Sequence, residues 1–211
     1  MSTLKKYSDW LFLKQWGIGF MKGDIQEIIR KRKNGFSFQW LQVSDKNTSY
    51  ADPFIFKSND GHVNVLYESV TSFELDGTIS LMVCDESFRA ITEKTILNNR
   101  KHLSYPFVFR ENGKTYVFPE NSLSGSLHCY EFDSDTRSLS NQKLIMDLPL
   151  IDPTILKYKN KYWLFCTMLG NQLNSELYIY YADSLTGPYS AHKNNPVKSG
   201  LNGTRPAGNF I

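Results

Sequence analysis

Ala51-Asp52-Pro53-Phe54-Ile55-Phe56 is the stretch of sequence that decides the fold, because the chain repeats its pattern. In each copy a polar or ionisable residue precedes a proline, and in the full copies an apolar run follows. The prolines are 53, 47 and 53 residues apart, close to the length of one four-stranded propeller blade. The sequence therefore predicts a tandem array of blades. The other copies are Ser104-Tyr105-Pro106-Phe107-Val108-Phe109, Ile151-Asp152-Pro153-Thr154-Ile155-Leu156 and the start of a fourth, Thr204-Arg205-Pro206-Ala207.

Each full copy continues as a β-hairpin, with a polar turn between two apolar strands. Asn-Gly and Asp-Gly turns are a strong hairpin signal, because glycine accepts the positive φ that a tight turn needs. The turns are Asn59-Asp60-Gly61, Glu111-Asn112-Gly113 and Lys159-Asn160-Lys161. Second strands are predicted over 62–67, 115–118 and 162–165, third strands over 77–84, 126–132 and 176–182, and fourth strands over 88–97 and 138–146.

The residues before the prolines predict a site. Proline itself suits the start of an innermost strand, where no ladder hydrogen bond is needed, but this role does not explain polar neighbours. In a propeller these strand ends converge on one mouth of the axial channel, and the returning strands deliver residues to the same mouth. The residues placed there are Asp52, Tyr105, Asp152 and Arg205 before the prolines, with Glu68, Glu120 and Thr167 on the returning strands.

The composition fits a soluble all-β domain. The 211 residues are 14% aromatic and 21% charged, which is enough to bury a sizeable core. A formal net charge of +3 is too small to indicate a nucleic acid or a membrane surface as partner. No apolar run reaches about 18 residues, so no membrane span is predicted. The amino terminus lacks a secretory pattern, so a cytoplasmic location is expected.

Metal and disulfide sites are not expected from the cysteine and histidine pattern. Cys84, Cys129 and Cys166 lie in predicted strands of different repeats, which favours reduced core thiols over a disulfide framework. The histidines are scattered and no pair has metal-ligand spacing. We therefore expect no metal site and no cofactor, while a calcium ion in the axial channel stays open as an alternative.

Residues 1–50 differ from the repeats and are predicted to form a separate amino-terminal part. The run from Asp24 to Arg30 predicts a short helix that Asp24 caps. Residues 36–43 alternate apolar and polar side chains, which predicts a strand that closes the ring with the last blade. Residues 51–211 then form the blades as a single domain.

The motifs resemble a known family. They are Ala51-Asp52-Pro53-Phe54, Tyr67-Glu68, the run from His102 to Phe109, Pro119-Glu120, Asp152-Pro153, Asn195-Pro196 and Arg205-Pro206-Ala207-Gly208. Together they look like the amino-terminal domain of glucosamine inositolphosphorylceramide transferases and its bacterial relatives. More distantly, the chain is similar to the five-bladed propellers of family 43 glycoside hydrolases. The separate glycosyltransferase domain of the plant enzymes has no counterpart here, so transferase activity is not inherited from the family name.

The family 43 resemblance implies catalytic roles. Asp52 matches the general base, and Asp152 matches the aspartate that tunes pKa and orients. The acid would be a fourth-blade glutamate, whose place falls beyond Ile211. Glu120 is the substitute, since a carboxyl packed beside Asp152 could have a raised pKa and act as acid. The alternative is structural, with Glu68 and Glu120 accepting hydrogen bonds from neighbouring blades.

The other residues of the predicted pocket are expected to bind substrate. Aromatic rings can stack on the face of a sugar, and polar groups at the mouth can bind its hydroxyls. The predicted substrate-binding residues are Glu68, Tyr105, Arg205 and Tyr67.

The chain length predicts an incomplete ring. At this period, the residues after position 50 supply about three blades and the first strand of a fourth, fewer than five blades need. An open array exposes a strand edge and part of a core face. We therefore expect a truncated product or fragment, or an array that associates with itself or with a partner chain through the open edge.

Three functions follow from the sequence. The leading hypothesis is a carbohydrate-active propeller, glycoside hydrolase-like if active, that acts on or binds a glycan or glycoconjugate in surface polysaccharide metabolism. The alternative is a non-catalytic sugar-binding or scaffolding module that works with a glycosyltransferase. A protein-interaction propeller is the third, and it predicts apolar patches at the pocket mouth in place of carboxylates. The missing acid leaves enzymatic activity undecided.

Overall fold

The protein is an all-β chain. The computed structural model describes residues 15–31, 38–41, 47–58, 60–71, 76–170 and 175–210. Within them strands dominate, and helix is confined to α2 (Ile25–Lys31) and a 3₁₀ turn, η1 (Ser122–Ser124). The prediction of an all-β chain is confirmed. No helix in this part of the chain is long and apolar enough to cross a membrane.

Two four-stranded antiparallel sheets come first, and in each the strands pair in the order in which they occur in the sequence. Sheet 1 consists of β3 (Thr48–Lys57), β4 (Val63–Thr71), β5 (Thr78–Cys84) and β6 (Ala90–Leu97). Sheet 2 consists of β7 (Ser104–Glu111), β8 (Lys114–Glu120), β9 (Leu127–Asp133) and β10 (Ser138–Met146). These bounds agree closely with the strands that the repeat predicts.

Sheet 3 begins in the same way but ends differently. Its strands are β11 (Leu150–Tyr158), β12 (Lys161–Met168), β13 (Glu176–Ala182), β14 (Ser190–Ala191) and β15 (Lys198–Ser199). The two short strands β14 and β15 both pair with β13, where sheets 1 and 2 have one long outer strand. Residues 200–210 contain no strand, although the repeat predicted the first strand of a fourth unit there.

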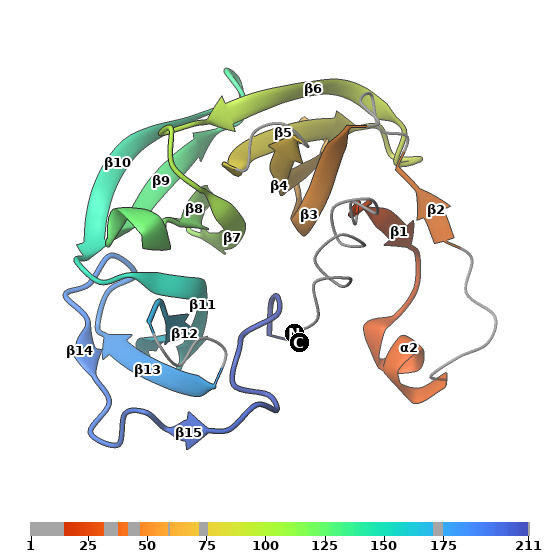
Figure 1. Cartoon of the computed structure of the whole chain (residues 1–211). Coiled ribbons are helices and arrows are strands. Elements are labelled where there is room, and N and C mark those ends of the chain that lie inside the picture. Colours follow the sequence, from red (N-terminus) through yellow and green to blue (C-terminus); the bar gives the residue numbers. More distant parts are fainter. Residues whose placement is uncertain are drawn as a thin grey trace, which may run out of the picture.

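The three sheets fan out around a common centre (Figure 1). Their first strands, β3, β7 and β11, lie innermost, and β6, β10 and β14 lie at the rim. Neighbouring inner strands are in contact, β3 with β7 and β7 with β11. The segment after β15 turns back towards the centre. Strand ends that are far apart in the sequence therefore meet at one place.

Two of the predicted hairpin turns are formed by left-handed residues. Asn112 and Gly113, with φ of 51° and 75°, join β7 to β8. Lys159 and Asn160, with φ of 48° and 59°, join β11 to β12 without a glycine. Positive φ at both central residues gives the turn twist that suits a two-residue hairpin. The first turn includes residue 59, which lies outside the described residues.

Each innermost strand has a bulge at its proline motif. The pairing register shifts between Ala51 and Phe54, and equivalent shifts occur in β7 and β11. The residue before each proline is left-handed, with φ of 48° at Asp52, 41° at Tyr105 and 50° at Asp152. This conformation is uncommon for residues other than glycine, and such strain persists where the surroundings over-determine it. The same local distortion is thus repeated in all three sheets.

A main hydrophobic core fills the spaces between the sheets. Phe54 and Phe107, equivalent residues of two repeats, meet edge to face with ring centroids 5.7 Å apart. Phe56 meets Phe132 of the next sheet in the same way at 5.0 Å. Because these rings join neighbouring sheets, the repeated apolar run is what packs one sheet on the next.

The amino-terminal part packs on sheet 1. Strands β1 (Gly19–Met21) and β2 (Phe38–Trp40) form a two-stranded sheet, and α2 lies between them in the sequence. Asp24 Oδ1 accepts the Gln26 N–H at 2.8 Å, so the predicted helix and its cap are present. Within the described residues β2 pairs with β1, and closure of a ring by residues 36–43 stays a prediction.

We expect Phe107→Ala to lower the free energy of unfolding by about 3 to 5 kcal/mol, because Phe107 is 2% exposed and its removal leaves a cavity between two sheets. Urea unfolding measures the change. Leu144→Ala is the matched control, since Leu144 on β10 is 53% exposed and its loss should change stability by about 0.5 kcal/mol or less. Equal effects of the two substitutions would contradict the packing described here.

Candidate functional site

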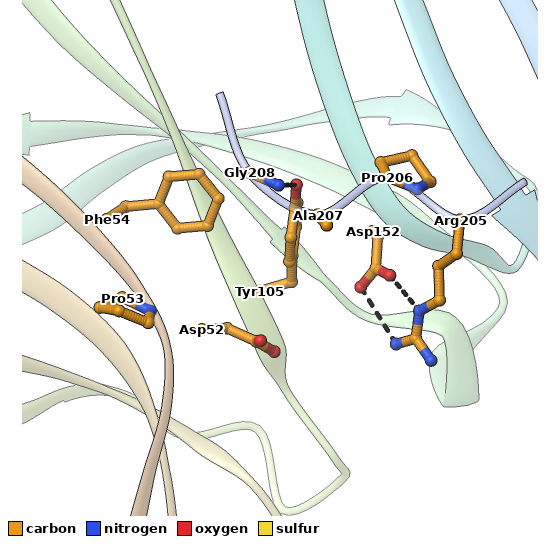
Figure 2. Close-up of a pocket in the computed structure, with 9 residues that line it drawn as sticks. All are labelled: Asp52, Pro53, Phe54, Tyr105, Asp152, Arg205, Pro206, Ala207 and Gly208. Atoms are coloured by element: carbon orange, nitrogen blue, oxygen red, sulfur yellow. Dashed lines mark hydrogen bonds and ion pairs between the residues drawn. The ribbon is translucent and has the colours of Figure 1, made fainter. Parts of the chain in front are cut away.

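A pocket of about 450 Å³ lies where the bulged ends of the three inner strands meet the segment after β15. Figure 2 shows the side chains of Asp52, Tyr105, Asp152 and Arg205 converging on it. The predicted convergence of these four residues is therefore present in the structure. The lining residues are Asp52, Pro53, Phe54, Tyr105, Asp152, Arg205, Pro206, Ala207 and Gly208.

Asp152 is held in a two-point ion pair. Arg205 Nη2 donates to Asp152 Oδ1 at 3.2 Å, and Arg205 Nε donates to Oδ2. Asp152 is 3% exposed, whereas the Arg205 side chain is 48% exposed. The hydrogen bonds to the Asp152 carboxylate raise the pKa of Arg205. This bidentate pair neutralises the buried carboxylate and anchors the segment after β15 to sheet 3.

Glu120 lies behind the pocket and accepts two hydrogen bonds. Its Oε2 accepts the Asp152 N–H at 3.0 Å, and its Oε1 accepts the Ser122 hydroxyl at 2.8 Å. Glu120 is 5% exposed and is not among the residues that line the pocket. Burial raises its pKa to about 7, the hydrogen bond from Asp152 opposes this, and the charge of Asp152 adds to it. These contacts are those expected of the structural alternative.

Asp52 and Glu68 form a hydrogen-bonded pair of carboxyl groups. Asp52 lines the pocket and also accepts the Tyr105 N–H, while Glu68 lies behind it and is 9% exposed. Burial raises the pKa of Glu68 to about 8, and the nearby carboxylates of Asp52 and Glu120 add to the effect. Burial also raises the pKa of Asp52, helped by Asp152 and opposed by Arg205. The pair therefore holds one proton near neutral pH.

Tyr105 closes one side of the pocket. Its hydroxyl lies 2.7 Å from Thr154 Oγ1 and accepts the Gly208 N–H at 2.7 Å. Burial raises the pKa of Tyr105 to about 12, so the hydroxyl stays protonated. The contact ties Gly208, which has a φ of 127° that favours glycine, to sheet 2.

The structure separates the predicted site residues into three groups. Asp52, Tyr105, Asp152 and Arg205 line the pocket, and Glu68 and Glu120 support it from behind. Tyr67 does not reach it.

The prediction that Tyr67 contacts a sugar is corrected. Tyr67 is fully buried on the other face of β4, where it stacks on Tyr50 at 5.1 Å between ring centroids. Its hydroxyl donates to Glu93 Oε1 at 2.6 Å. It belongs to a smaller core with residues of the amino-terminal part, including Ile18 and Leu41.

Several contributors were not predicted from the sequence. Ser122 and Thr154 hold site residues by their hydroxyls, and no local pattern marks them. Ala207 and Gly208 lie in a motif that the family resemblance included, which was the available signal. Thr167, by contrast, was predicted at the mouth but does not line the pocket; it is 1% exposed, and its hydroxyl has no hydrogen-bond partner among the described residues. The described residues contain no group of three His, Cys, Asp or Glu side chains suited to a metal ion.

Sequence comparison relates most of the chain to one family. Residues 38–210 match the family model described as Glucosamine inositolphosphorylceramide transferase 1, N-terminal. The protein of that name from Oryza sativa subsp. japonica is 30% identical over 203 residues, which cover 86% of this chain and 27% of the relative. The Arabidopsis thaliana protein is 32% identical over 154 residues, which cover 71% of this chain and 20% of the relative.

The chain thus spans about a quarter of the length of these curated relatives. They are plant proteins, so the expectation of bacterial relatives was wrong on this point.

Structural comparison relates the fold to family 43 glycoside hydrolases. An exo-β-1,3-galactanase from Phanerochaete chrysosporium, solved with β-1,3-galactotriose, superposes with a TM-score of 0.64 at 12% identity, over 84% of this chain and 43% of that chain. A thermostable family-43 glycoside hydrolase superposes with a TM-score of 0.61 at 15% identity, over 78% of this chain and 62% of that chain. At this level of identity the likeness concerns the fold alone, and it confirms the expected propeller type.

We expect Glu68→Gln to flatten the dependence of stability on pH. A carboxyl whose pKa is higher in the folded state than its ordinary 4.5 favours folding most at low pH, and this contribution is lost as the pH rises to about 8. The wild type should therefore lose more unfolding free energy than Glu68→Gln between these pH values, as urea unfolding would measure. Asp135→Asn, at an exposed acid, is the control and should follow the wild type. Parallel curves for wild type and Glu68→Gln would refute the raised pKa.

Proposed function

The chain belongs to the family of the amino-terminal domain of glucosamine inositolphosphorylceramide transferase 1, and we propose that its central pocket binds a sugar unit of a glycan or glycoconjugate. The relatives carry the name glucosamine inositolphosphorylceramide transferase 1, which contains an amino sugar. A solved protein of similar fold was captured with a β-1,3-linked galactose trisaccharide. Both names refer to carbohydrate. The lining of the pocket must then offer groups that can bind a sugar.

One observation carries the proposal. The pocket combines an apolar wall at Phe54 with the Asp52 carboxylate, the Tyr105 hydroxyl and the Arg205 guanidinium, all converging on about 450 Å³. Small-molecule sites of this size have apolar walls and a few placed polar groups that fix orientation. A sugar presents hydroxyls at its rim and an apolar face, so it meets both kinds of wall.

Binding is supported better than hydrolysis. Hydrolysis of a glycosidic bond needs two carboxyl groups on the two sides of the bond, one protonated and one ionised. Both oxygens of the Asp152 carboxylate are paired with Arg205, and Glu120 does not line the pocket. Asp52 is then the one lining carboxyl of the described residues that has no two-point ion pair with an arginine. This arrangement favours a sugar-binding module that works with a glycosyltransferase, in which Asp52 and Asp152 bind and orient.

One observation favours hydrolysis as a second candidate function. The pKa of Glu120 is raised to about 7 by burial, so the group holds a proton near neutral pH as a general acid must. Asp52 would be the base and Asp152 the orienting aspartate. For this role Glu120 would need access to the pocket, which it does not line in this structure.

A second part of the proposal concerns the arrangement of the three sheets. We infer that sheets 1 to 3 are three blades of a five-bladed arrangement, supported by the repeat period and by the likeness to family 43 proteins. Association of the open edge of sheet 3 with another chain stays a prediction, which sedimentation velocity of the purified chain tests.

We expect the wild-type protein to bind saccharides from a panel that contains β-1,3-galactotriose and glucosamine, as isothermal titration would show. Asp52→Asn should weaken the binding about tenfold or more, because a hydrogen bond to a charged group is lost, a change of about 1.4 kcal/mol or more. Asp135→Asn, an exposed acid outside the pocket, should bind like the wild type. Aryl-glycosides incubated with the wild type test turnover. Saccharide binding without turnover supports the sugar-binding module. Turnover that is lost in Asp52→Asn supports the hydrolase. If the protein binds no saccharide of the panel, both candidate functions are refuted.

A further inference from the structure

The Asp52 and Glu68 pair continues outward to a histidine that the site described above does not use. His102 Nε2 lies 3.4 Å from Glu68 Oε1, and its side chain is 30% exposed. On the other side of the ring, the Gly77 N–H donates to His102 Nδ1 at 3.1 Å. Four residues from sheet 1 and the start of sheet 2 are thus connected, from a partly exposed imidazole to the wall of the pocket.

The hydrogen bond from Gly77 determines where the proton of His102 lies. A ring nitrogen that accepts an N–H hydrogen bond cannot carry a proton itself, so Nδ1 is unprotonated. His102 is therefore neutral, and its proton is on Nε2. This N–H faces Glu68 Oε1.

Gly77 is placed so that only glycine fits. A Cβ atom there would lie 2.4 Å from Leu103 O and 2.8 Å from Glu68 Oε1, both far inside van der Waals contact. The Leu103 N–H also donates to Gly77 O at 2.9 Å, so the backbone of Gly77 binds the histidine segment by donating and by accepting. The segment leads directly to Tyr105, whose N–H binds Asp52. The connection therefore depends on the close approach of two backbone segments, which a glycine at position 77 allows.

We propose that His102 is a positioning residue of the pocket, which holds Glu68 by its Nε2–H so that the Glu68 proton is presented to Asp52. Two carboxyl groups can share a hydrogen bond only when one of them carries a proton. With one Glu68 oxygen facing the His102 donor, the proton belongs on the other oxygen. The inference rests on the proposed function in one respect, that Asp52 is the carboxylate that meets the sugar.

The consequence is an Asp52 carboxylate with two fixed donors. It accepts the Tyr105 N–H and the Glu68 hydroxyl, which together orient it and favour its charged form. The groups that face Glu68 are the carboxyls of Asp52, Glu120 and Asp152 and the imidazole of His102. Burial, and after it the three carboxyls, disfavour a charge on Glu68 and raise its pKa to about 8, so the shared proton stays with Glu68 up to about that pH.

The first test uses the free protein and needs no ligand. NMR of ¹⁵N-labelled histidine should show His102 as the neutral tautomer with its proton on Nε2. The infrared difference between wild type and Glu68→Gln, in which the band of Glu120 is common to both, should show a protonated carboxyl band that disappears with a midpoint near pH 8. An Nδ1-protonated or charged His102 at neutral pH would overturn the inference, whether or not any saccharide binds.

The second test follows the titration of Asp52 by NMR of its labelled carboxyl carbon. The hydrogen bond from Glu68 lowers the pKa of Asp52, so Glu68→Ala and His102→Ala should both raise it. Because His102 acts through Glu68, the double substitution should add nothing beyond Glu68→Ala alone. Additive shifts would show that His102 acts independently and would overturn the proposal.

Conservative variants separate positioning from mere structural support. His102→Gln places an amide N–H where Nε2–H lies, so the Asp52 titration should match the wild type. His102→Asn places its amide near Nδ1 and should behave like His102→Ala. Identical titrations of the Gln and Asn variants would contradict a role for the Nε2–H. Urea unfolding of each variant checks that it is folded.

Discussion

The arrangement depends on two backbone N–H groups, those of Tyr105 and Asp152, which stand before two of the repeated prolines. The bulge at the proline motif takes each of these residues out of the strand ladder and turns it into a left-handed conformation. A buried N–H without an acceptor is costly, so a partner is required. Glu120 of sheet 2 accepts the N–H of Asp152 in sheet 3, and Asp52 of sheet 1 accepts that of Tyr105 in sheet 2. The carboxylates that build the pocket are therefore also the joints between sheets.

Much of the fold could be predicted because short stretches of sequence are enough to recognise the repeat. Proline spacing, hairpin turns and aromatic runs each report on a few consecutive residues, and they placed the sheets and the four residues that meet at the pocket. Features that depend on distant partners could not be read in this way. Tyr67 and Glu68 are neighbours on one strand, yet they face opposite sides, because successive side chains of a strand alternate. The partner of β2 and the approach of Gly77 to the segment of His102 depend on how separate loops pack, for which no local pattern exists.

The charges of the site are the reason why we propose sugar binding in preference to hydrolysis for this chain. Four carboxyl groups are gathered at the site, and each is stabilised differently: Asp152 by an ion pair with Arg205, Glu120 by two donors, and Asp52 and Glu68 by a shared proton. Only Asp52 combines access to the pocket with freedom from a direct two-point ion pair with the arginine. The sugar ligand that we propose would therefore find its polar contacts at residues before the prolines.

The segment after β15 joins two sheets across long stretches of chain, and this bears on the order in which the protein assembles. Arg205 meets Asp152 across 53 residues, and Gly208 meets Tyr105 across 103. Each sheet is formed by hairpins between consecutive strands, which need only short loops to close, whereas these two contacts must wait until distant parts of the chain are together. We therefore expect these two contacts, and with them the complete pocket, to form after the hairpins of each sheet.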